Sequence, residues 1–326
     1  LGAQSNAFTG EEYTGYYAKS DAKHFKQIFD VVSDIYLNST FPEAEMQKEK
    51  GVIVEEINMY EDMPHRHVQD LFMELLYGNQ PAGWNIAGTR ENVKSFNRDD
   101  FVNYKHAHYV PSATTVVVAG QINQKQVEAE VKRVFGVLKN TKKETKTKTI
   151  EKQSTPQIHI EYKKTDQTHF VLGVRTVDTY SEKNSILTVL STILAGGMSS
   201  RLFIKLREEL GVAYYVRSHN DTYTDHGALS ISAGVSNNRV AEVVAEILVE
   251  CKKLTTELVS KKELDKVKEY LTGNMKLELE SSDAWTSFYG SQEIMKKKIK
   301  TPSDIETKIR KVTAKQIQYM AKEIFV

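Results

Sequence analysis

Two carboxylates spaced seven residues apart are the first side chains whose pattern could support chemistry. The stretch EKGVIVEEINMYED (49–62) has helical periodicity, and at about 100° per residue it places Glu49 and Glu56 on one face. Ile53 and Ile57 share that face, so both glutamates lie on a stripe that ought to be apolar. A carboxylate there is costly to desolvate unless a cation or hydrogen-bond donors compensate, and a divalent metal is a strong compensator.

The helix pattern alone leaves a second interpretation open. Glu49 and Glu56 would then only border the apolar stripe and pair with lysines such as Lys50. Glu55 is an adjacent candidate for the metal role, but at helical spacing it faces away from Glu49.

Three other patterns could suggest a functional site, but structural roles explain them better. The histidines of HRH (65–67) follow Pro64, which interrupts the helix, so a solvated loop or helix start is expected. His106 and His108 are two residues apart and would point to different sides of a helix. The segment AGGMSS (195–200) follows a helix and lacks the pattern of a phosphate-binding loop, so it predicts no nucleotide site.

Helices and a few strands are predicted to position these residues in the first half. Strand composition marks residues 6–20, and a helix with a Ser20 or Asp21 cap follows. A long helical pattern runs from Pro42 toward Tyr77, with a kink or break at Pro64. The remaining predicted elements are a helix at 99–108, a β-branched strand at 113–120 and an amphipathic helix at 123–138.

The second half is predicted to contain the same kinds of element. Residues 157–164 and 168–176 read as a hairpin joined through TDQ. The elements expected after it are helices at 185–194 and 201–210, strands at 212–220 and 226–235, and helices at about 238–255, 260–280, 284–297 and 312–323.

The two halves resemble each other in pattern, which indicates a duplicated unit. The best matches pair Gly2 with Gly211 and Val110 with Val326. Residues 156–210 of the second copy have no counterpart in the first, and the first copy continues past Val110 into PSATTVVVAG. We therefore expect both ends of the parent protein to be missing from this sequence, which also begins without a Met.

The segment 139–157 is rich in Lys and Thr, contains a proline and has Ile150 as its only large apolar residue, which is typical of an interdomain linker. It separates an expected N-terminal domain at 1–138 from a C-terminal domain at 158–326. The expected fold class is α/β (α+β), with both helices and strands in each domain.

Composition excludes several classes of function. Lys and Arg total 44 and Asp and Glu total 43, so the net charge of +1 provides no basic field for nucleic acid. No apolar run approaches the roughly 18 residues that span a bilayer. Cys251 is the only cysteine, which precludes an intrachain disulfide, favours a reducing compartment and predicts a buried, inert thiol.

Several long motifs carry a family resemblance. EKGVIVEEINMYEDMP, SNAFTGEEYTGYY, IAGTRENVKSFNRDDFVNYKHAHYVPSATTVVVAG and LAGGMSSRLFIKLREELGVAYYV together resemble the pitrilysin/insulinase family of zinc metallopeptidases. The nearest subgroup is the bacterial processing-protease type, which is similar to the mitochondrial processing peptidase. The resemblance implies two duplicated domains, each with a mixed, mostly antiparallel sheet flanked by helices, that enclose a substrate chamber.

The resemblance also implies roles for particular residues. In the family an H-x-x-E-H helix supplies two His ligands and the general base, and a downstream Glu supplies the third zinc ligand. No H-x-x-E-H occurs in this sequence, and its expected place is just before Leu1. Glu56 corresponds to the ligand glutamate and Glu49 to a carboxylate that supports the site. The edge strand SNAFT would pair with the substrate peptide, which places Asn6, Ala7 and Phe8 along the cleft.

LREELGVAY matches the second-domain Arg and Tyr of the family, which identifies Arg207 and Tyr214. Arg207 would bind a substrate carbonyl or carboxylate, and the Tyr214 hydroxyl would stabilise the oxyanion of the tetrahedral intermediate. The alternatives are a surface ion pair of Arg207 with Glu208 or Glu209 and a core position for Tyr214 in a strand.

The resemblance predicts a zinc endopeptidase that cleaves unfolded peptides or presequences, with zinc bound in the complete enzyme. Lacking two ligands and the base, residues 1–326 should be inactive alone. The alternative is a non-catalytic, peptide-binding or scaffold member of the family. The expected partners are a polypeptide substrate and, as is frequent in this subgroup, a second copy or a paired subunit, with no nucleic acid and no membrane. The expected location is the cytoplasm of a bacterium-like cell.

Overall fold

The computed structural model describes residues 1–139, 144–295 and 298–326, which group into two compact units. Unit 1 comprises Leu1–Met59, Asn85–Thr147 and Glu278–Ile299, and unit 2 comprises Tyr60–Trp84, Lys148–Leu277 and Lys300–Val326. Both units draw on residues from either side of the predicted linker 139–157, so a domain boundary at this linker remains a prediction. Residues 140–143 of that linker and 296–297 of the predicted helix 284–297 lie outside the described residues.

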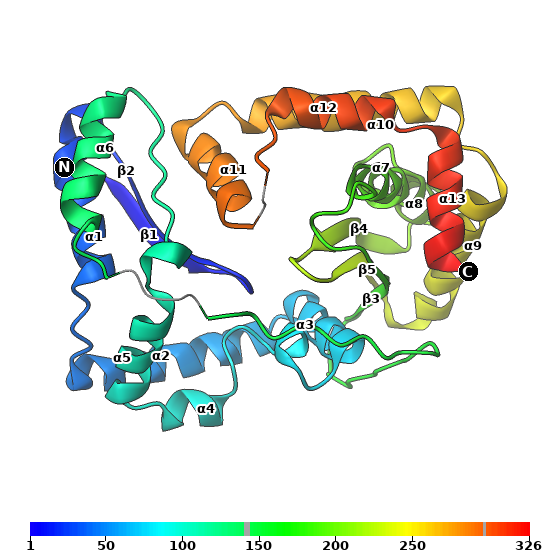
Figure 1. Ribbon diagram of the computed structural model, residues 1–326. Helices are drawn as coiled ribbons and strands as arrows, with labels where there is room; N and C mark the ends of the chain where they lie inside the picture. Colours follow the sequence, from blue (N-terminus) through cyan, green and yellow to red (C-terminus); the bar gives the residue numbers. More distant parts are fainter. Residues whose placement is uncertain (140–143, 296–297) are drawn as a thin grey trace. The chain divides into compact units, whose positions relative to one another are not determined.

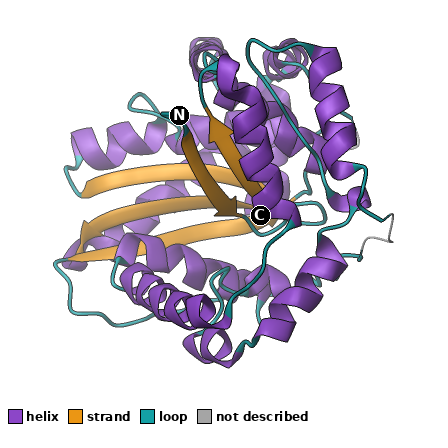
Figure 2. Ribbon diagram, turned by 90° about the vertical axis from the view of Figure 1, so that its left-hand side faces the viewer, coloured by secondary structure: helices purple, strands orange, loops and turns teal. Residues whose placement is uncertain are grey.

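Unit 2 is built on a three-stranded antiparallel sheet. Its strands are β3 (Gln167–Thr176), β4 (Ala213–Thr222) and β5 (Gly227–Ser236), in the order β3-β5-β4, and they form one layer in Figure 2. The central strand, β5, is buried along all but its last residue. Its sequence GALSISAGVS has small and apolar side chains, as a strand covered on both faces requires.

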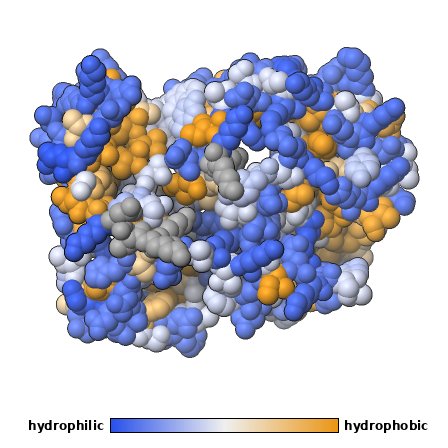
Figure 3. Space-filling view, in the orientation of Figure 1, coloured by the Kyte–Doolittle hydropathy of each residue, from blue (hydrophilic) through white to orange (hydrophobic). Residues whose placement is uncertain are grey.

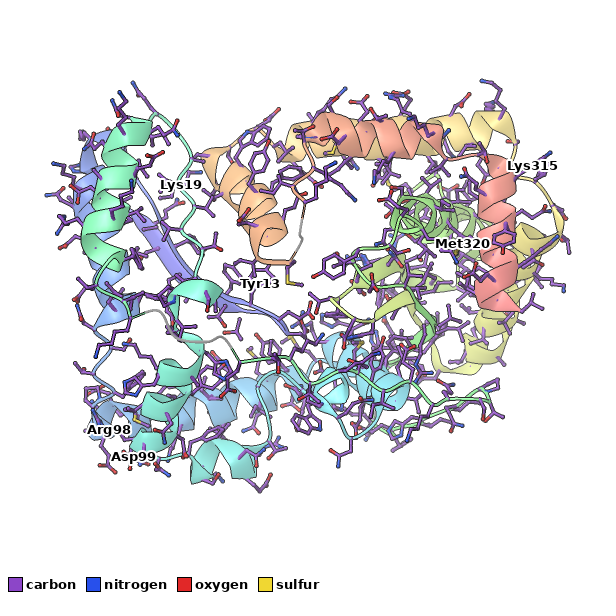
Figure 4. The ribbon with its side chains drawn as sticks, in the orientation of Figure 1. Tyr13, Lys19, Arg98, Asp99, Lys315 and Met320 are labelled. Atoms are coloured by element: carbon purple, nitrogen blue, oxygen red, sulfur yellow. The ribbon has the colours of Figure 1, made fainter. Side chains whose placement is uncertain are left out.

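Helices α7 (Asn184–Ala195), α9 (Val240–Thr256) and α13 (Ala314–Phe325) pack with this sheet around the main apolar core (Figure 1). Met320, labelled in Figure 4, is 2% exposed on α13. The other fully buried large side chains of the core include Leu187, Leu190, Ile193, Leu194, Ile231, Ile247 and Ile317. The predicted helices 185–194, 238–255 and 312–323 are thus confirmed.

Unit 2 also contains the α-helices α3 (Pro64–Tyr77), α8 (Arg201–Phe203), α10 (Lys261–Glu278, the last residue of which is assigned to unit 1) and α12 (Pro302–Lys311). Pro64 occupies the first turn of α3, where its missing N–H costs nothing, so the predicted break is confirmed. Phe72 of α3 packs on β3 at Gly173, where a Cβ would lie 2.5 Å from the Phe72 ring. Helix α12 was not predicted, although Thr301 and Asp304 form a capping box at its start.

Unit 1 contains an antiparallel pair of strands, β1 (Gln4–Thr9) and β2 (Thr14–Lys19). Its helices are α1 (Phe25–Leu37), α2 (Glu43–Glu61, the last two residues of which are assigned to unit 2), α4 (Arg90–Ser95), α5 (Arg98–His108), α6 (Gln124–Phe135) and α11 (Ser282–Met295). The Asp21 side chain accepts from the Lys23 N–H at 3.0 Å, and the Asn97 capping box with Asp100 begins α5.

The two units repeat one order of elements, as the sequence match predicts. β1, β2 and α1 follow one another in unit 1, and β4, β5 and α9 do so in unit 2. Helices α5 and α13 correspond in the second matched region. The fold is therefore α+β with duplicated elements and antiparallel sheets.

Unit 1 buries far fewer apolar side chains than unit 2. Its buried apolar residues within the described part are Met46, Ile57, Val93 and Val110. In contrast, Phe8 and Tyr17 of its two strands are 45% and 46% exposed. Val116 and Val117 are each 37% exposed, and Figure 3 shows apolar surface over this part of unit 1.

Two predicted strands are wrong. The predicted strands 113–120 and 157–164 pair with no strand among the residues that the structure describes. In the second segment, the alternate side chains Ile158, Ile160 and Tyr162 are 83%, 85% and 91% exposed. β-branched composition favours a strand, but a ladder also requires a neighbouring edge, and composition cannot supply one.

The C-terminal part of the predicted linker is attached to unit 2. The Thr149 N–H donates to Asp225 Oδ2 at 2.7 Å. The Ile150 N–H donates to Gln80 Oε1 at 2.8 Å, and Gln80 Nε2 donates to the Ile150 carbonyl at 2.9 Å. Residues 144–148 are exposed throughout.

Trypsin should therefore cut the folded protein first within the predicted linker 139–157, in which residues 144–148 are exposed. Mass spectrometry of a limited digest would identify the first products. Resistance in this segment, with first cuts inside either half, would contradict the assignment of a linker here.

Among the described residues, no helix combines the length and apolar character that crossing a bilayer would require.

Candidate functional site

Helix α2 carries Glu49 and Glu56, and both side chains are exposed. At 1.5 Å per residue they lie about 10 Å apart along the helix axis. Ile57 is buried and Ile53 is half-buried, but the desolvation expected for Glu56 is not found. Lys50, the partner in the alternative interpretation, donates instead to the Lys94 main-chain carbonyl at 3.1 Å.

The donor groups of the described residues do not form a zinc site. No cluster of three or more His, Cys, Asp or Glu side chains that could hold a metal ion occurs in residues 1–139, 144–295 and 298–326. Protein zinc sites use three or four ligands, and Glu56 by itself offers one carboxylate.

The 326-residue chain alone should therefore bind zinc no more tightly than a surface carboxylate does, because one carboxylate cannot compete with water for the ion. Isothermal titration calorimetry of the chain with zinc measures this directly. Tight, stoichiometric binding would refute the expectation.

Strand β1 presents Asn6, Ala7 and Phe8 beside an open edge. All six residues of β1 are exposed, and its sheet has only β1 and β2 among the described residues. The Ala7 N–H donates to Asn6 Oδ1 at 2.8 Å, so a peptide that used this N–H would displace the Asn6 side chain. An open edge of this kind can add a peptide strand through main-chain hydrogen bonds.

Phe8 turns across the hairpin. Its ring meets the Tyr13 ring edge to face at 5.6 Å between centroids, and Tyr13 is labelled in Figure 4. A Cβ at Gly15 would lie 2.4 Å from the Phe8 ring, so a larger side chain at this position of β2 would displace the ring. The Phe8 ring thus packs against Tyr13 and over Gly15, and Phe8 is 45% exposed.

The structure brings Arg207 and Tyr214 together. Arg207 lies in a π-helical turn (η4, Ile204–Glu209), its guanidinium is 5.6 Å from the Phe203 ring centroid, and its Nη1 donates to the Tyr214 main-chain carbonyl. Tyr214 is 66% exposed at the start of β4, so the alternative of a core residue does not hold. Glu209 pairs with Lys205 at 3.1 Å.

Tyr215, the next residue, is held differently. Its hydroxyl is 3.1 Å from His169 Nδ1, and the two rings stack with centroids 5.8 Å apart. Burial raises the pKa of Tyr215, while burial and the nearby His65 lower the pKa of His169. Both shifts favour the neutral forms, which fits a hydrogen bond between a neutral Tyr215 hydroxyl and a neutral His169 ring.

A cavity of about 570 Å³ lies in unit 2 between α7, β4 and α10. Its walls include Gly196, Gly197 and Met198 of the AGGMSS segment, together with Phe203 and Tyr270. Gly197 is close to the Tyr270 ring, since a Cβ there would lie 3.3 Å from it. The segment set aside as a phosphate loop therefore forms a cavity wall, and Phe203 joins the cavity to Arg207.

The weaker candidates have structural partners. His67 Nε2 lies 3.1 Å from Glu161 Oε2, and His108 Nε2 lies 3.9 Å from Glu144 Oε2. Cys251 is buried, and burial raises its thiol pKa to about 12, which makes it an inert thiol as predicted.

The predicted site residues are divided between the units. Residues 6–8, Glu49 and Glu56 belong to unit 1, whereas Arg207 and Tyr214 belong to unit 2. Sequence reasoning missed Phe203, although its place four residues before Arg207 on a helical pattern is the spacing at which side chains meet.

Two protein-family models match most of the chain. "Insulinase (Peptidase family M16)" matches residues 1–90, and "Peptidase M16 inactive domain" matches residues 95–271. The uncharacterized zinc protease YmxG of Bacillus subtilis is 37% identical over 100% of this chain and 79% of its own length. An uncharacterized zinc protease of Mycobacterium leprae is 32% identical over 99% of this chain and 74% of its own length.

Solved structures share the fold. A protease from Helicobacter pylori has a TM-score of 0.90 at 22% identity, over 100% of this chain and 80% of that one. A peptidase M16 inactive domain from Pseudomonas fluorescens has a TM-score of 0.86 at 18% identity, over 99% of this chain and 78% of that one. With relatives above 30% identity along the whole chain, the resemblance seen in the motifs is confirmed: the chain belongs to the insulinase family of peptidases, family M16.

Proposed function

We propose that this chain forms the greater part of a zinc-dependent endopeptidase that cleaves unfolded peptides or presequences. The observation that carries the proposal is the pair of Arg207 and Tyr214. Arg207 donates to the Tyr214 carbonyl, and both side chains are exposed outside the core of unit 2. The names of the relatives, which are called zinc proteases, support the same class of reaction.

The residues of this chain would bind and orient the peptide. The open edge of β1 would pair with the substrate main chain, and Asn6, Ala7 and Phe8 would line it. Arg207 uses one guanidinium N–H on the Tyr214 carbonyl, which leaves others for a substrate carbonyl or carboxylate. The Tyr214 hydroxyl would donate to the oxyanion that forms at the attacked carbonyl.

The zinc requirement is part of the proposal, and the described residues do not meet it alone. Glu56 would supply one carboxylate ligand, and Glu49 would support it from two turns earlier on α2. The remaining ligands and the base would come from an H-x-x-E-H helix, a motif that this sequence does not contain. Residues 1–326 alone would then be inactive.

A non-catalytic, peptide-binding member of the family is the second candidate. The match of residues 95–271 to a domain described as inactive favours it. Assaying the full-length protein with zinc against a fluorogenic unfolded peptide separates the two candidates. Cleavage that a chelator abolishes supports the peptidase, and peptide binding without cleavage supports the scaffold.

The setting of the enzyme is also proposed. A polypeptide is its substrate, and a second copy or a paired subunit is its partner in assembly. The single cysteine fits a reducing compartment such as a bacterial cytoplasm.

A further inference from the structure

The chain between α8 and β4 forms a π-helical turn, η4 (Ile204–Glu209), instead of a regular helix. The Leu210 N–H donates to the Lys205 carbonyl, five residues back, at 3.1 Å. This turn contains one residue more than an α-helical turn, in which the donor lies four residues after the acceptor. π-Helical turns are rare and occur frequently at functional sites.

Buried side chains before and after the π-helical turn determine where in the chain the extra residue lies. Leu202 and Leu206 are 0% exposed, and Val212 is 5% exposed. The Val212 N–H donates to the Leu206 carbonyl at 2.9 Å. Because these anchors belong to the core, the extra residue is accommodated in the exposed stretch 207–209.

That stretch begins with Arg207, whose direction is fixed by two contacts. Its guanidinium lies over the Phe203 ring at 5.6 Å and donates to the Tyr214 carbonyl. An exposed arginine without such contacts samples many rotamers, and ordering it costs side-chain entropy. Phe203 itself is half-buried against the cavity, so its ring offers a fixed surface.

We infer that the π-helical turn and the Phe203 ring together position Arg207 beside Tyr214 for substrate binding. This inference rests on the proposed peptidase function and adds Phe203 to it as a positioning residue. Phe203 acts through Arg207 and contacts no reacting atom. The turn sets the direction of the Arg207 side chain. The Phe203 ring holds the guanidinium beside Tyr214 before the peptide binds.

Deleting Glu208 from the full-length enzyme tests the turn. Glu208 is exposed, and its removal leaves the Leu210 N–H four residues after the Lys205 carbonyl, the α-helical spacing. The turn can then close as an α-helix while Leu206 and Val212 stay buried. We expect Tm to stay the same or rise, while kcat/KM falls at least about threefold, toward the value for Arg207→Ala.

Glu208→Ala is the matched control, because it removes the same side chain and keeps the length of the chain. It should leave both Tm and kcat/KM unchanged. A deletion variant that is folded and cleaves peptide at the unmodified rate would overturn the role of the turn.

Phe203→Leu tests the ring at constant chain length, also if the deletion variant does not fold. We expect a lower kcat/KM in the unmodified background and no further loss in the Arg207→Ala background, since Phe203 acts only through Arg207. Phe203→Tyr keeps an aromatic ring and should restore kcat/KM. Equal losses in both backgrounds would show a merely structural role and overturn the inference.

A spectroscopic readout separates this inference from the proposed function. In the full-length protein labelled with ¹⁵N-arginine, the Arg207 Nε–Hε signal should carry the ring-current shift of Phe203. The shift should disappear in Phe203→Leu and change when Glu208 is deleted. If these signals respond but no peptide is cleaved, the positioning holds and the peptidase proposal fails; a signal that does not respond overturns the positioning itself.

Discussion

Glu56→Gln in the full-length parent should remove the zinc and abolish peptide hydrolysis. The neutral amide is a far poorer zinc ligand than a carboxylate, and protein zinc sites have only three or four ligands. Glu49→Gln should weaken both properties less, by about 10-fold to 100-fold, as expected of a group that supports a ligand without binding the metal. Zinc per molecule, measured by atomic absorption, and cleavage of a fluorogenic peptide test both expectations.

Glu55→Gln is the matched control, since Glu55 is also exposed on α2 but faces away from Glu49. It should leave zinc content and activity unchanged. Because Glu56 is exposed, its replacement should not lower the Tm of the zinc-free protein, so chelated samples separate metal loss from misfolding. Retained zinc and activity in Glu56→Gln would show that Glu56 is not the ligand. Loss of both in Glu55→Gln would show that the ligand is the neighbouring glutamate.

The predicted elements that proved correct depend on local signals. Pro64 ends one helical pattern and opens the next because it lacks an N–H and fits the first turn. Asp21 caps the region before α1 through a neighbouring N–H. Signals of this kind involve residues within a few positions of each other, so a single sequence contains them in full.

The strands that failed depend on distant partners. Residues 114–119 and 157–164 have the composition of strands, yet their pairing requires an edge that no local pattern can reveal. The stripe on α2 is buried only in part: Ile57 is buried and Ile53 is half-buried, while Glu49 and Glu56 are exposed. Periodicity placed Glu56 on the face of Ile53 and Ile57, but burial depends on what covers that face.

For Arg207 and Tyr214, the sequence predicted which residues form the pair but not the backbone that positions them. Motif resemblance identified both residues, and the structure joins them through the Tyr214 carbonyl. The π-helical turn that directs Arg207 could not be predicted, because LREEL reads as a regular helix and the extra residue shows only in the i to i+5 hydrogen bond.

Arg207→Ala and Tyr214→Phe in the full-length parent should each lower kcat/KM for a fluorogenic peptide by at least about tenfold, which corresponds to about 1.4 kcal/mol of transition-state stabilisation. Tyr214→Phe keeps the main-chain carbonyl that holds Arg207, so it tests the hydroxyl alone. Both side chains are exposed, so zinc content and Tm should stay nearly unchanged.

Tyr215→Phe is the matched control, because Tyr215 is adjacent and its hydroxyl bonds to His169 instead of facing solvent. It should lower stability by about 1 kcal/mol, the typical contribution of one hydrogen bond, with little change in kcat/KM per folded molecule. The opposite pattern, with lost stability in Arg207→Ala and Tyr214→Phe and activity that falls only with the folded fraction, would make both residues structural. If the unmodified full-length protein with zinc cleaves no unfolded peptide, the peptidase proposal is wrong whatever the variants do. The peptide-binding scaffold is then the function that remains.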